Sequence, residues 1–187
     1  MELGERLSRD LDGNFMELVT LHQDLVFGVA LRVVRRPADA EDVAQEAFVR
    51  AYRALSRYPA ERVRELKLRP WLARIALNQA RNWLRGRPTD AELDQAAESR
   101  AVVGNEPVRL AVRREERRFW QALLDELPPR YRLPVALRHV EGLSYAELAQ
   151  TLERPVGTVK SDVHRGVRLL RAAYERAEQN NRQREAV

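Results

Sequence analysis

Residues 39–55 read DAEDVAQEAFVRAYRAL, and this stretch decides the fold of the first half of the chain. Apolar residues recur on one side at helical spacing, which predicts a helix that covers a core and has Asp39 as its N-cap. These inward residues are Ala44, Ala47, Phe48, Ala51 and Leu55. A second side carries Asp42, Gln45, Glu46, Val49 and Arg53. It is either an ordinary solvated face or a surface that docks onto another protein.

The composition bounds the class of protein. The chain has 187 residues, of which 44% are hydrophobic and 33% charged, as in a soluble globular protein. Its net charge of +5 favours a polyanionic partner. Because it has no cysteine, disulfides, thiolate zinc sites and cysteine nucleophiles are excluded. No apolar run resembles a signal peptide or a membrane span, so we expect a cytoplasmic protein.

The sequence predicts an all-α fold of two small helical domains joined by a flexible linker, since no segment alternates as a half-buried strand does. Residues 1–12 are polar and read as an irregular N-terminal arm. The first domain is expected at 13–87 and the second at 108–175. Between them, 88–107 is acidic, lacks aromatic residues and reads as the linker. The polar tail, 176–187, is expected to fray.

Helical periodicity and proline positions divide the first domain. Residues 14–35 form one predicted helix, which Pro37 ends, so that it makes a hairpin with the next helix. Residues 56–68 are too polar and broken for a confident helix and read as a loop that can hold a turn of helix. Pro70 suits the first position of a helix that runs to about Arg85.

A basic stripe runs along one side of the helix that begins at Pro70. Trp71 precedes the stripe, whose members are Arg74, Asn78, Arg81, Asn82 and Arg85. Guanidinium groups hold phosphates, amides pair with base edges, and an indole can stack on an unpaired base, so the stripe would suit nucleic acid. The alternative is a basic solvated face with Trp71 in the core.

Proline and glycine also divide the second domain. We expect helices at about 108–127 and 131–140, separated by Pro128 and Pro129, and Gly142 ends the second of them. Ser144-Tyr-Ala-Glu147 is a capping box that opens a short helix. A turn at 153–155 then leads to a helix at about 156–173. Its packed residues are expected to be Val156, Val159, Val163, Val167 and Leu170.

The outward side of the 156–173 helix is polar and basic: Thr158, Lys160, Ser161, His164, Arg165 and Arg168. A short capped helix, a tight turn and a longer helix with such a side predict a helix-turn-helix over Tyr145 to His164. Hydroxyls, Lys and Arg at this place suit phosphates and base edges in a major groove. A purely structural three-helix bundle is the alternative.

Four motifs in series resemble those of the group IV, or extracytoplasmic function (ECF), sigma factors of RNA polymerase. DAEDVAQEAF at 39–48 resembles the core-binding helix of that family, and PWLARIALNQARNWLR at 70–85 its promoter-melting helix. EGLSYAELA at 141–149 and PVGTVKS at 155–161 resemble its second helix-turn-helix domain. The resemblance covers residues 14–175.

The resemblance implies a sigma factor that binds core RNA polymerase and directs promoter recognition, strand opening and initiation. The helix at 39–55 would lie against the clamp coiled coil of the largest subunit, with the flap of the second-largest subunit as another contact. The loop 56–68, with Arg62, would capture a flipped base of the −10 element, and the stripe after Trp71 would hold the opened strand. Arg138 and Tyr145 would touch phosphates of the −35 element. The outward side of the 156–173 helix would lie in or beside the major groove of that element.

The resemblance also implies an anti-sigma factor that keeps the chain inactive until a stress signal arrives. It implies no cofactor, no metal, no catalytic residue and no small-molecule substrate. Two departures from the family pattern stand out. Asp162 occupies a position where the family often has arginine, so it either accepts from a cytosine amine or turns away from the phosphates. The loop 56–68 is longer and more charged than is common.

Two other classes of protein compete with this interpretation. A helix-turn-helix repressor or activator would bind duplex DNA without core polymerase. An enzyme is the more distant rival, because His22, His139 and His164 are far apart in sequence, and neither an HExxH motif nor a glycine-rich phosphate loop is present.

Overall fold

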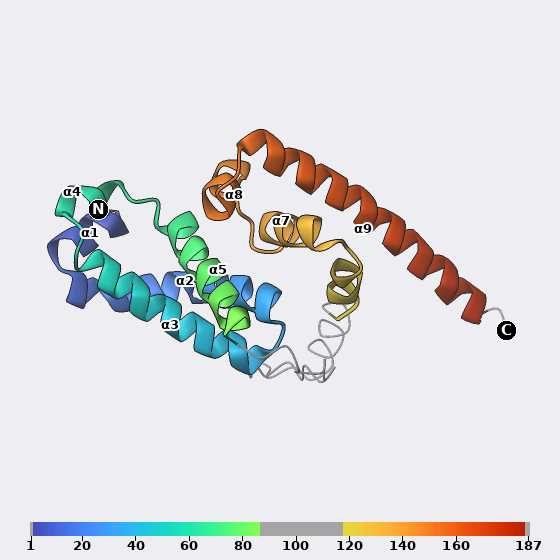
Figure 1. The fold of residues 1–187 in the computed structure, drawn as a ribbon, viewed down its shortest axis with the longest axis horizontal. Coiled ribbons are helices and arrows are strands. Elements are labelled where there is room, and N and C mark those ends of the chain that lie inside the picture. The colour runs from blue at the N-terminus through green and yellow to red at the C-terminus, as the bar shows by residue number, and fades with distance from the viewer. Residues whose placement is uncertain (1, 87–117, 186–187) are drawn as a thin grey trace. The chain divides into compact units, whose positions relative to one another are not determined.

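The computed structural model describes residues 2–86 and 118–185, and every regular element within these ranges is an α-helix (Figure 1). The all-α prediction is therefore confirmed. The described residues form two compact units: 2–86 with 146–153, and 118–145 with 154–185. None of the helices in these ranges is long and apolar enough to cross a lipid bilayer. The expected linker at 88–107 lies outside the described residues.

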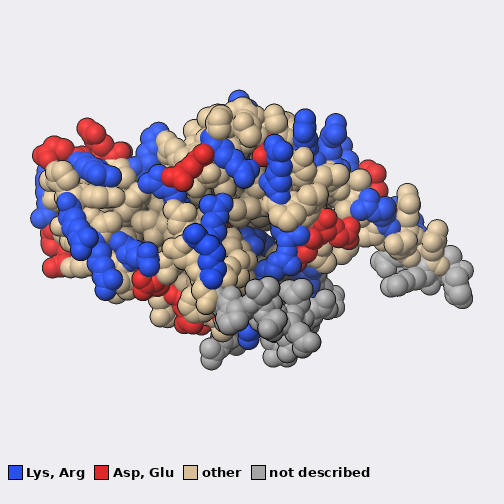
Figure 2. Space-filling view, viewed as in Figure 1, with Lys and Arg blue, Asp and Glu red and all other residues tan. Residues whose placement is uncertain are grey.

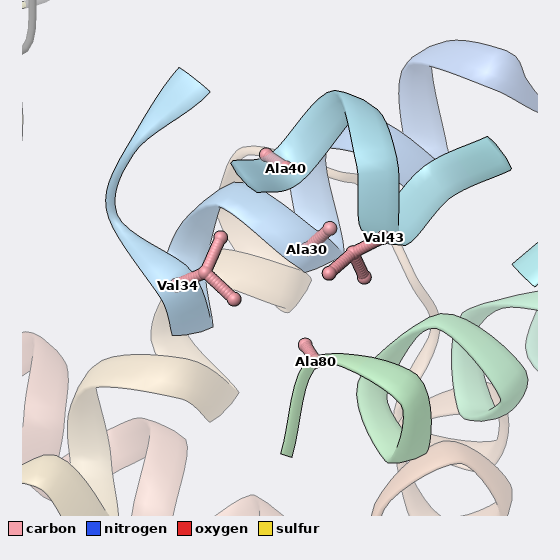
Figure 3. Packing of buried hydrophobic residues seen from close by; sticks show 5 residues of the cluster. All are labelled: Ala30, Val34, Ala40, Val43 and Ala80. Atoms are coloured by element: carbon pink, nitrogen blue, oxygen red, sulfur yellow. The ribbon is translucent and has the colours of Figure 1, made fainter. Parts of the chain in front are cut away.

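Three helices pack on one another to form the core of the first unit. The helices of this unit are α1 (Leu3–Arg9), α2 (Leu11–Val34), α3 (Pro37–Leu55), α4 (Ala60–Glu65) and α5 (Leu68–Arg85). One end of the core is a cluster from α2, α3 and α5 (Figure 3): Ala30, Val34, Ala40, Val43 and Ala80. Most of these side chains are small, so the three helix backbones approach closely. The predicted inward side of α3 is confirmed, since Ala47, Ala51 and Leu55 are buried.

The start of α3 differs from the prediction. Its N-cap is Arg36 and its first residue is Pro37, whose fixed φ and missing N–H suit the first helical position. Asp39 therefore lies inside the first turn and is not the cap. It is only 6% exposed, and Arg36 Nε lies 4.0 Å from its Oδ2. A carboxylate here still interacts favourably with the positive end of the helix dipole.

The expectation of an irregular arm at 1–12 is wrong, because α1 is a helix that packs on α2 and α4. Its Leu7 is 3% exposed. Asp10 then caps α2 by accepting a hydrogen bond from the Gly13 N–H at 2.9 Å. Seven residues with one large buried side chain carry too little periodicity to be recognised, and tertiary packing stabilises the helix instead.

The segment 56–68 contains the expected turn of helix as α4. The helix that follows begins at Leu68, two residues earlier than predicted, so Pro70 is its third residue. This position is tolerated because the N–H groups of a first turn have no partner within the helix.

The second unit is built mainly from α7 (Pro129–His139), α9 (Val156–Glu185) and a helical segment at 118–125. Between α7 and α9 the chain forms α8 (Tyr145–Leu152). In the second unit, Leu124 and Leu127 pack with Val135 of α7. Gly166 lets α9 approach α7 closely, since a Cβ there would lie 2.4 Å from Val135 Cγ2.

The end of α9 also corrects the prediction. The helix continues to Glu185, so the tail expected to fray is helical over 176–185. Ion pairs accompany this extension: Arg176 Nη2 lies 3.2 Å from Glu126 Oε2, and Arg182 Nη2 lies 3.5 Å from Glu178 Oε2. Polar pairs four residues apart support a helix that has no apolar period. At the other end, Val156 is 41% exposed rather than packed.

Candidate functional site

The outward side of α3, called here the α3 face, presents the predicted docking residues together. Asp42, Gln45, Val49 and Arg53 are exposed, and Glu46 is half-buried. Glu46 Oε1 accepts from Arg50 Nε at 3.0 Å, so the face also carries an ion pair that the sequence reading missed. Val49 is 43% exposed. A surface of mixed charge with an exposed apolar residue suits a protein partner better than it suits DNA phosphates, because its two carboxylates would repel a polyanion.

Tyr52 connects the α3 face to α2. Its hydroxyl donates to Asp12 Oδ1, and its ring meets Phe15 edge-on with centroids 5.1 Å apart. The hydrogen bond to Asp12, and then the negative charge of that carboxylate, raise the pKa of Tyr52. The spacing of four residues from Phe48 to Tyr52 is helical, but the sequence gives no sign of the partner on α2.

A groove in the first unit lies beside the basic stripe of α5. Its lining from α3, α5 and the segment between them is Arg50, Ala54, Tyr58, Trp71, Arg74, Ile75, Asn78, Gln79 and Asn82. Asn78, Arg81, Asn82 and Arg85 are exposed, and Arg74 is half-buried, so the predicted stripe does face outward. Arg85 Nη2 donates to Asn82 Oδ1. The stripe thus combines cations and amides beside a hollow, as binding of a single strand requires.

Trp71 does not stand on this outward stripe. It is 6% exposed, which agrees with the alternative that placed the indole in the core. Tyr58 is the half-buried aromatic residue beside it, with ring centroids 6.2 Å apart, and the Arg62 guanidinium lies 3.8 Å from the Tyr58 ring centroid. Gln79 is a further residue of the groove that the sequence did not indicate. Its Oε1 is buried, and the described ranges contain no hydrogen-bond partner for it.

The helix-turn-helix segment has the backbone that its sequence predicts. Gly142, at φ 68°, follows α7 in the left-handed region, and Glu153, at φ 54°, begins the turn after α8. On α9, Val159 and Val163 are buried, whereas Thr158 is half-buried. The exposed members of the predicted side are Lys160, Ser161, His164, Arg165 and Arg168. Figure 2 shows Lys and Arg side chains over the part of the surface that α9 occupies in Figure 1.

Tyr145 is the centre of a small cluster on this segment. Its ring stacks near His164, with centroids 6.5 Å apart, and Lys160 Nζ lies 5.7 Å from its centroid. Arg138 lies over the same ring at 5.1 Å and donates from Nη1 to the Leu143 carbonyl at 3.1 Å. Two pairs to which the resemblance gave different roles, Arg138 with Tyr145 and Lys160 with His164, therefore lie around one ring, and cation–π attraction favours these positions of the cations.

Asp162 is turned into the second unit and is 1% exposed. Arg130 Nε donates to its Oδ1 at 3.0 Å, and Arg154 Nη1 donates to its Oδ2 at 3.3 Å. Of the two alternatives from the sequence, this geometry is the one in which the carboxylate turns away from phosphates. Neither arginine carried a sequence signal, because the contact joins α7, the turn and α9.

In the ranges that the structure describes, no group of His, Asp and Glu side chains is arranged to hold a metal ion. The candidate site consists of three surfaces: an α3 face of mixed charge, a basic groove on α5, and a helix-turn-helix with a basic outer side. Basic surfaces of this kind on an all-α protein are typical of DNA-binding proteins.

Comparison with known families agrees with this class. Sigma-70 region 2 matches residues 18–88, and Sigma-70, region 4 matches residues 120–170. The RNA polymerase sigma-H factor of Pseudomonas aeruginosa is 36% identical over 174 residues, which is 88% of each chain. The ECF RNA polymerase sigma factor SigW of Bacillus subtilis is 32% identical over 84% of this chain and 87% of its own. The chain therefore belongs to the ECF branch of the sigma-70 family of RNA polymerase sigma factors.

Solved structures support the same fold. CnrH, in complex with the cytosolic domain of CnrY, is 26% identical, covers 92% of this chain and 95% of its own, and superposes with a TM-score of 0.65. The sigma factor RpoE of Bartonella quintana, solved with the anti-sigma factor NepR, is 20% identical over 86% of this chain and 96% of its own. Its TM-score of 0.66 shows likeness of fold.

Proposed function

We propose that the α3 face docks this sigma factor onto core RNA polymerase. The carboxylates and amide of Asp42, Gln45 and Glu46 would meet the clamp coiled coil of the largest subunit, and Val49 would supply apolar contact at the centre. The exposure of Asp42, Gln45 and Val49 on the same side of α3 as the half-buried Glu46 supports the proposal. The flap of the second-largest subunit is the further contact that the family resemblance suggests, and the chain would act beside the polymerase in the cytoplasm.

The groove beside α5 is proposed to hold the opened −10 strand. Arg81 and Arg85 would bind phosphates, and Asn78 and Asn82 would meet base edges. Tyr58, rather than the buried Trp71, is the aromatic residue suited to stack beside a flipped base, since it is half-buried and lines the groove. Arg62 would hold the phosphate next to that base.

The helix-turn-helix is proposed to bind the −35 element in its major groove. Lys160, Ser161 and Arg165 are exposed near the start of α9, the end of a recognition helix that meets base edges. Arg138 and Tyr145 would contact the neighbouring phosphates. His164 and Arg168, further along the helix, would lie beside the groove.

An anti-sigma factor is the proposed regulator. CnrH is held by the cytosolic domain of CnrY in its solved structure, and an equivalent partner here would cover the α3 face or the DNA-binding surfaces. Release of that partner under stress would then free the chain for core polymerase. Binding energy alone would drive strand opening, with no bond chemistry in this chain.

The observation that carries the proposal is the order of the surfaces: the α3 face and the α5 groove lie within the first matched region, and the basic side of α9 within the second. Footprinting on genomic promoters with and without core polymerase is the test. We expect protection of both elements and permanganate-reactive thymines only with core present. Strong, sequence-specific protection by the chain alone would favour a helix-turn-helix repressor or activator instead.

A further inference from the structure

The helix α1 lies outside the matched Sigma-70 region 2, which begins at residue 18. It is nevertheless built into the first unit. Arg6 Nη2 forms an ion pair with Glu17 of α2, and Asn14 Nδ2 donates to the Arg6 carbonyl at 3.5 Å. These contacts anchor α1 to α2, and α1 also packs on α4.

Backbone packs directly against backbone where α1 meets α4. A Cβ on Gly4 would lie 3.1 Å from the Val63 carbonyl oxygen and 3.3 Å from the Arg64 carbonyl oxygen. Gly4 is buried, and Leu7 and Val63 are each 3% exposed. The contact is therefore tight: a Cβ alone would require the α4 backbone to give by a few tenths of an ångström, and a large side chain would displace the last turn of α4.

A helix of six residues cannot hold its own position in water, because nucleation costs more than so few hydrogen bonds return. The position of α4 thus depends on what it packs against. Arg62 of α4 lies over the ring of Tyr58, and Tyr58 contacts Trp71 at the groove. A shift of α4 would consequently move the aromatic residue and the cation proposed to meet the −10 strand.

We propose that α1 is a brace that positions the loop 56–68 for recognition of an unpaired base, with Gly4 and Leu7 as positioning residues that touch no DNA themselves. The proposal rests on the −10 function assigned above to this loop. It predicts that the base preference of the loop depends on residues outside the region that the family match covers.

The first test measures the brace without DNA. In the full chain bound to core polymerase, Gly4→Leu should speed hydrogen exchange at the Val63 and Leu66 amides by about tenfold or more, because both bond within this segment. The amides of α3 and α5 should stay protected. Glu2→Leu is the matched control, because Glu2 is exposed and makes no side-chain cap bond. Unchanged exchange in Gly4→Leu would overturn the brace.

The second test measures its consequence for recognition. Each holoenzyme would select from a random pool of single-stranded oligonucleotides. We expect wild type and Glu2→Leu to enrich one motif, and Gly4→Leu to lose that preference by about tenfold, the scale of one stacked base. Affinity for core polymerase should be unchanged. If Gly4→Leu unfolds the unit, Leu7→Ala serves in both tests.

The outcomes separate the two proposals. Retained base preference in Gly4→Leu, with faster exchange at Val63, would show that the brace does not govern recognition. Absence of any enriched motif with the wild-type holoenzyme would overturn the −10 function of the loop, while the exchange result would still decide whether α1 holds α4.

Discussion

Among single residues, Asp162 is a buried carboxylate that two arginines from other segments hold in place. The carboxylate is almost fully buried, whereas the side chains of Arg130 and Arg154 are 58% and 41% exposed. Both arginines can turn to water if the carboxylate is lost. We therefore expect Asp162→Ala to lower the free energy of unfolding by about 1–3 kcal/mol, less than the roughly 3–5 kcal/mol for a pair whose remaining charge stays buried.

Hydrogen exchange at the most protected amides of α7 and α9 measures this loss. Glu175→Ala is the control, because Glu175 is an exposed acid on the same helix. An equal effect of both substitutions would contradict the structural role of Asp162. From the sequence alone, Asp162 could either accept from a cytosine amine or turn away from the phosphates. The period of the helix gives the side of a residue only approximately, and the two partners come from other segments.

His22 gives the stability of the first unit a dependence on pH. Burial, and then the positive charge of Arg69, lower the pKa of His22 below its ordinary value of about 6.5. The unfolded chain therefore binds the proton more readily than the folded chain. Stability should be full above the unfolded pKa and should fall as the pH drops through the lower folded pKa.

Thermal melting of wild type and His22→Gln at about pH 7.5 and about pH 5.5 checks this prediction. The wild type should lose more stability on acidification than the variant does. His139, whose pKa is also lowered by burial and then by Arg138, acts in the same direction in both chains, so it cancels in the comparison. Identical losses in the two chains would contradict the role of His22.

At the scale of whole elements, substitutions on α3 can test binding to core polymerase without disturbing the fold. Asp42 and Glu41 are adjacent, exposed and of like charge, but only Asp42 lies on the α3 face. Asp42→Lys should abolish co-purification with core polymerase, because it places a cation where the partner is expected to meet a carboxylate. Glu41→Lys should retain core binding. Circular dichroism of both variants should match wild type, and loss of core binding in both would mean that net charge matters rather than the face.

Elements with a strong apolar period could be read from the sequence, and those without one could not. The two sides of α3 and the outward stripe of α5 follow directly from spacing. The helix α1 and the last three turns of α9 have few buried side chains, so packing and ion pairs with other segments determine them. Trp71 shows the same limit within an element: its position beside the stripe was evident, but its burial depends on neighbours such as Tyr58.

At the scale of the whole molecule, the two units are proposed to contribute to different steps of initiation. Arg165→Ala should weaken the first, duplex-bound complex by about 1–3 kcal/mol on the cognate promoter, because one bidentate contact to a base is worth that much. Opening of the strands should proceed at its usual rate once the complex has formed. Scrambling the −35 element supplies the control, since wild type and variant should then bind equally. An equal loss on scrambled DNA would mean that Arg165 contacts only phosphate.

The complementary variant, Asn78→Ala with Arg81→Ala, should leave duplex binding unchanged and slow strand opening, seen as delayed permanganate reactivity. Trp71 is left intact because substitution of this buried residue would mix unfolding with loss of binding.

The overall rate of initiation is the product of an equilibrium constant for the first step and a rate constant for the second. Free-energy losses at the two sites should therefore add within about 0.5 kcal/mol in the triple variant. A combined loss far from that sum would show that one unit senses what the other has bound.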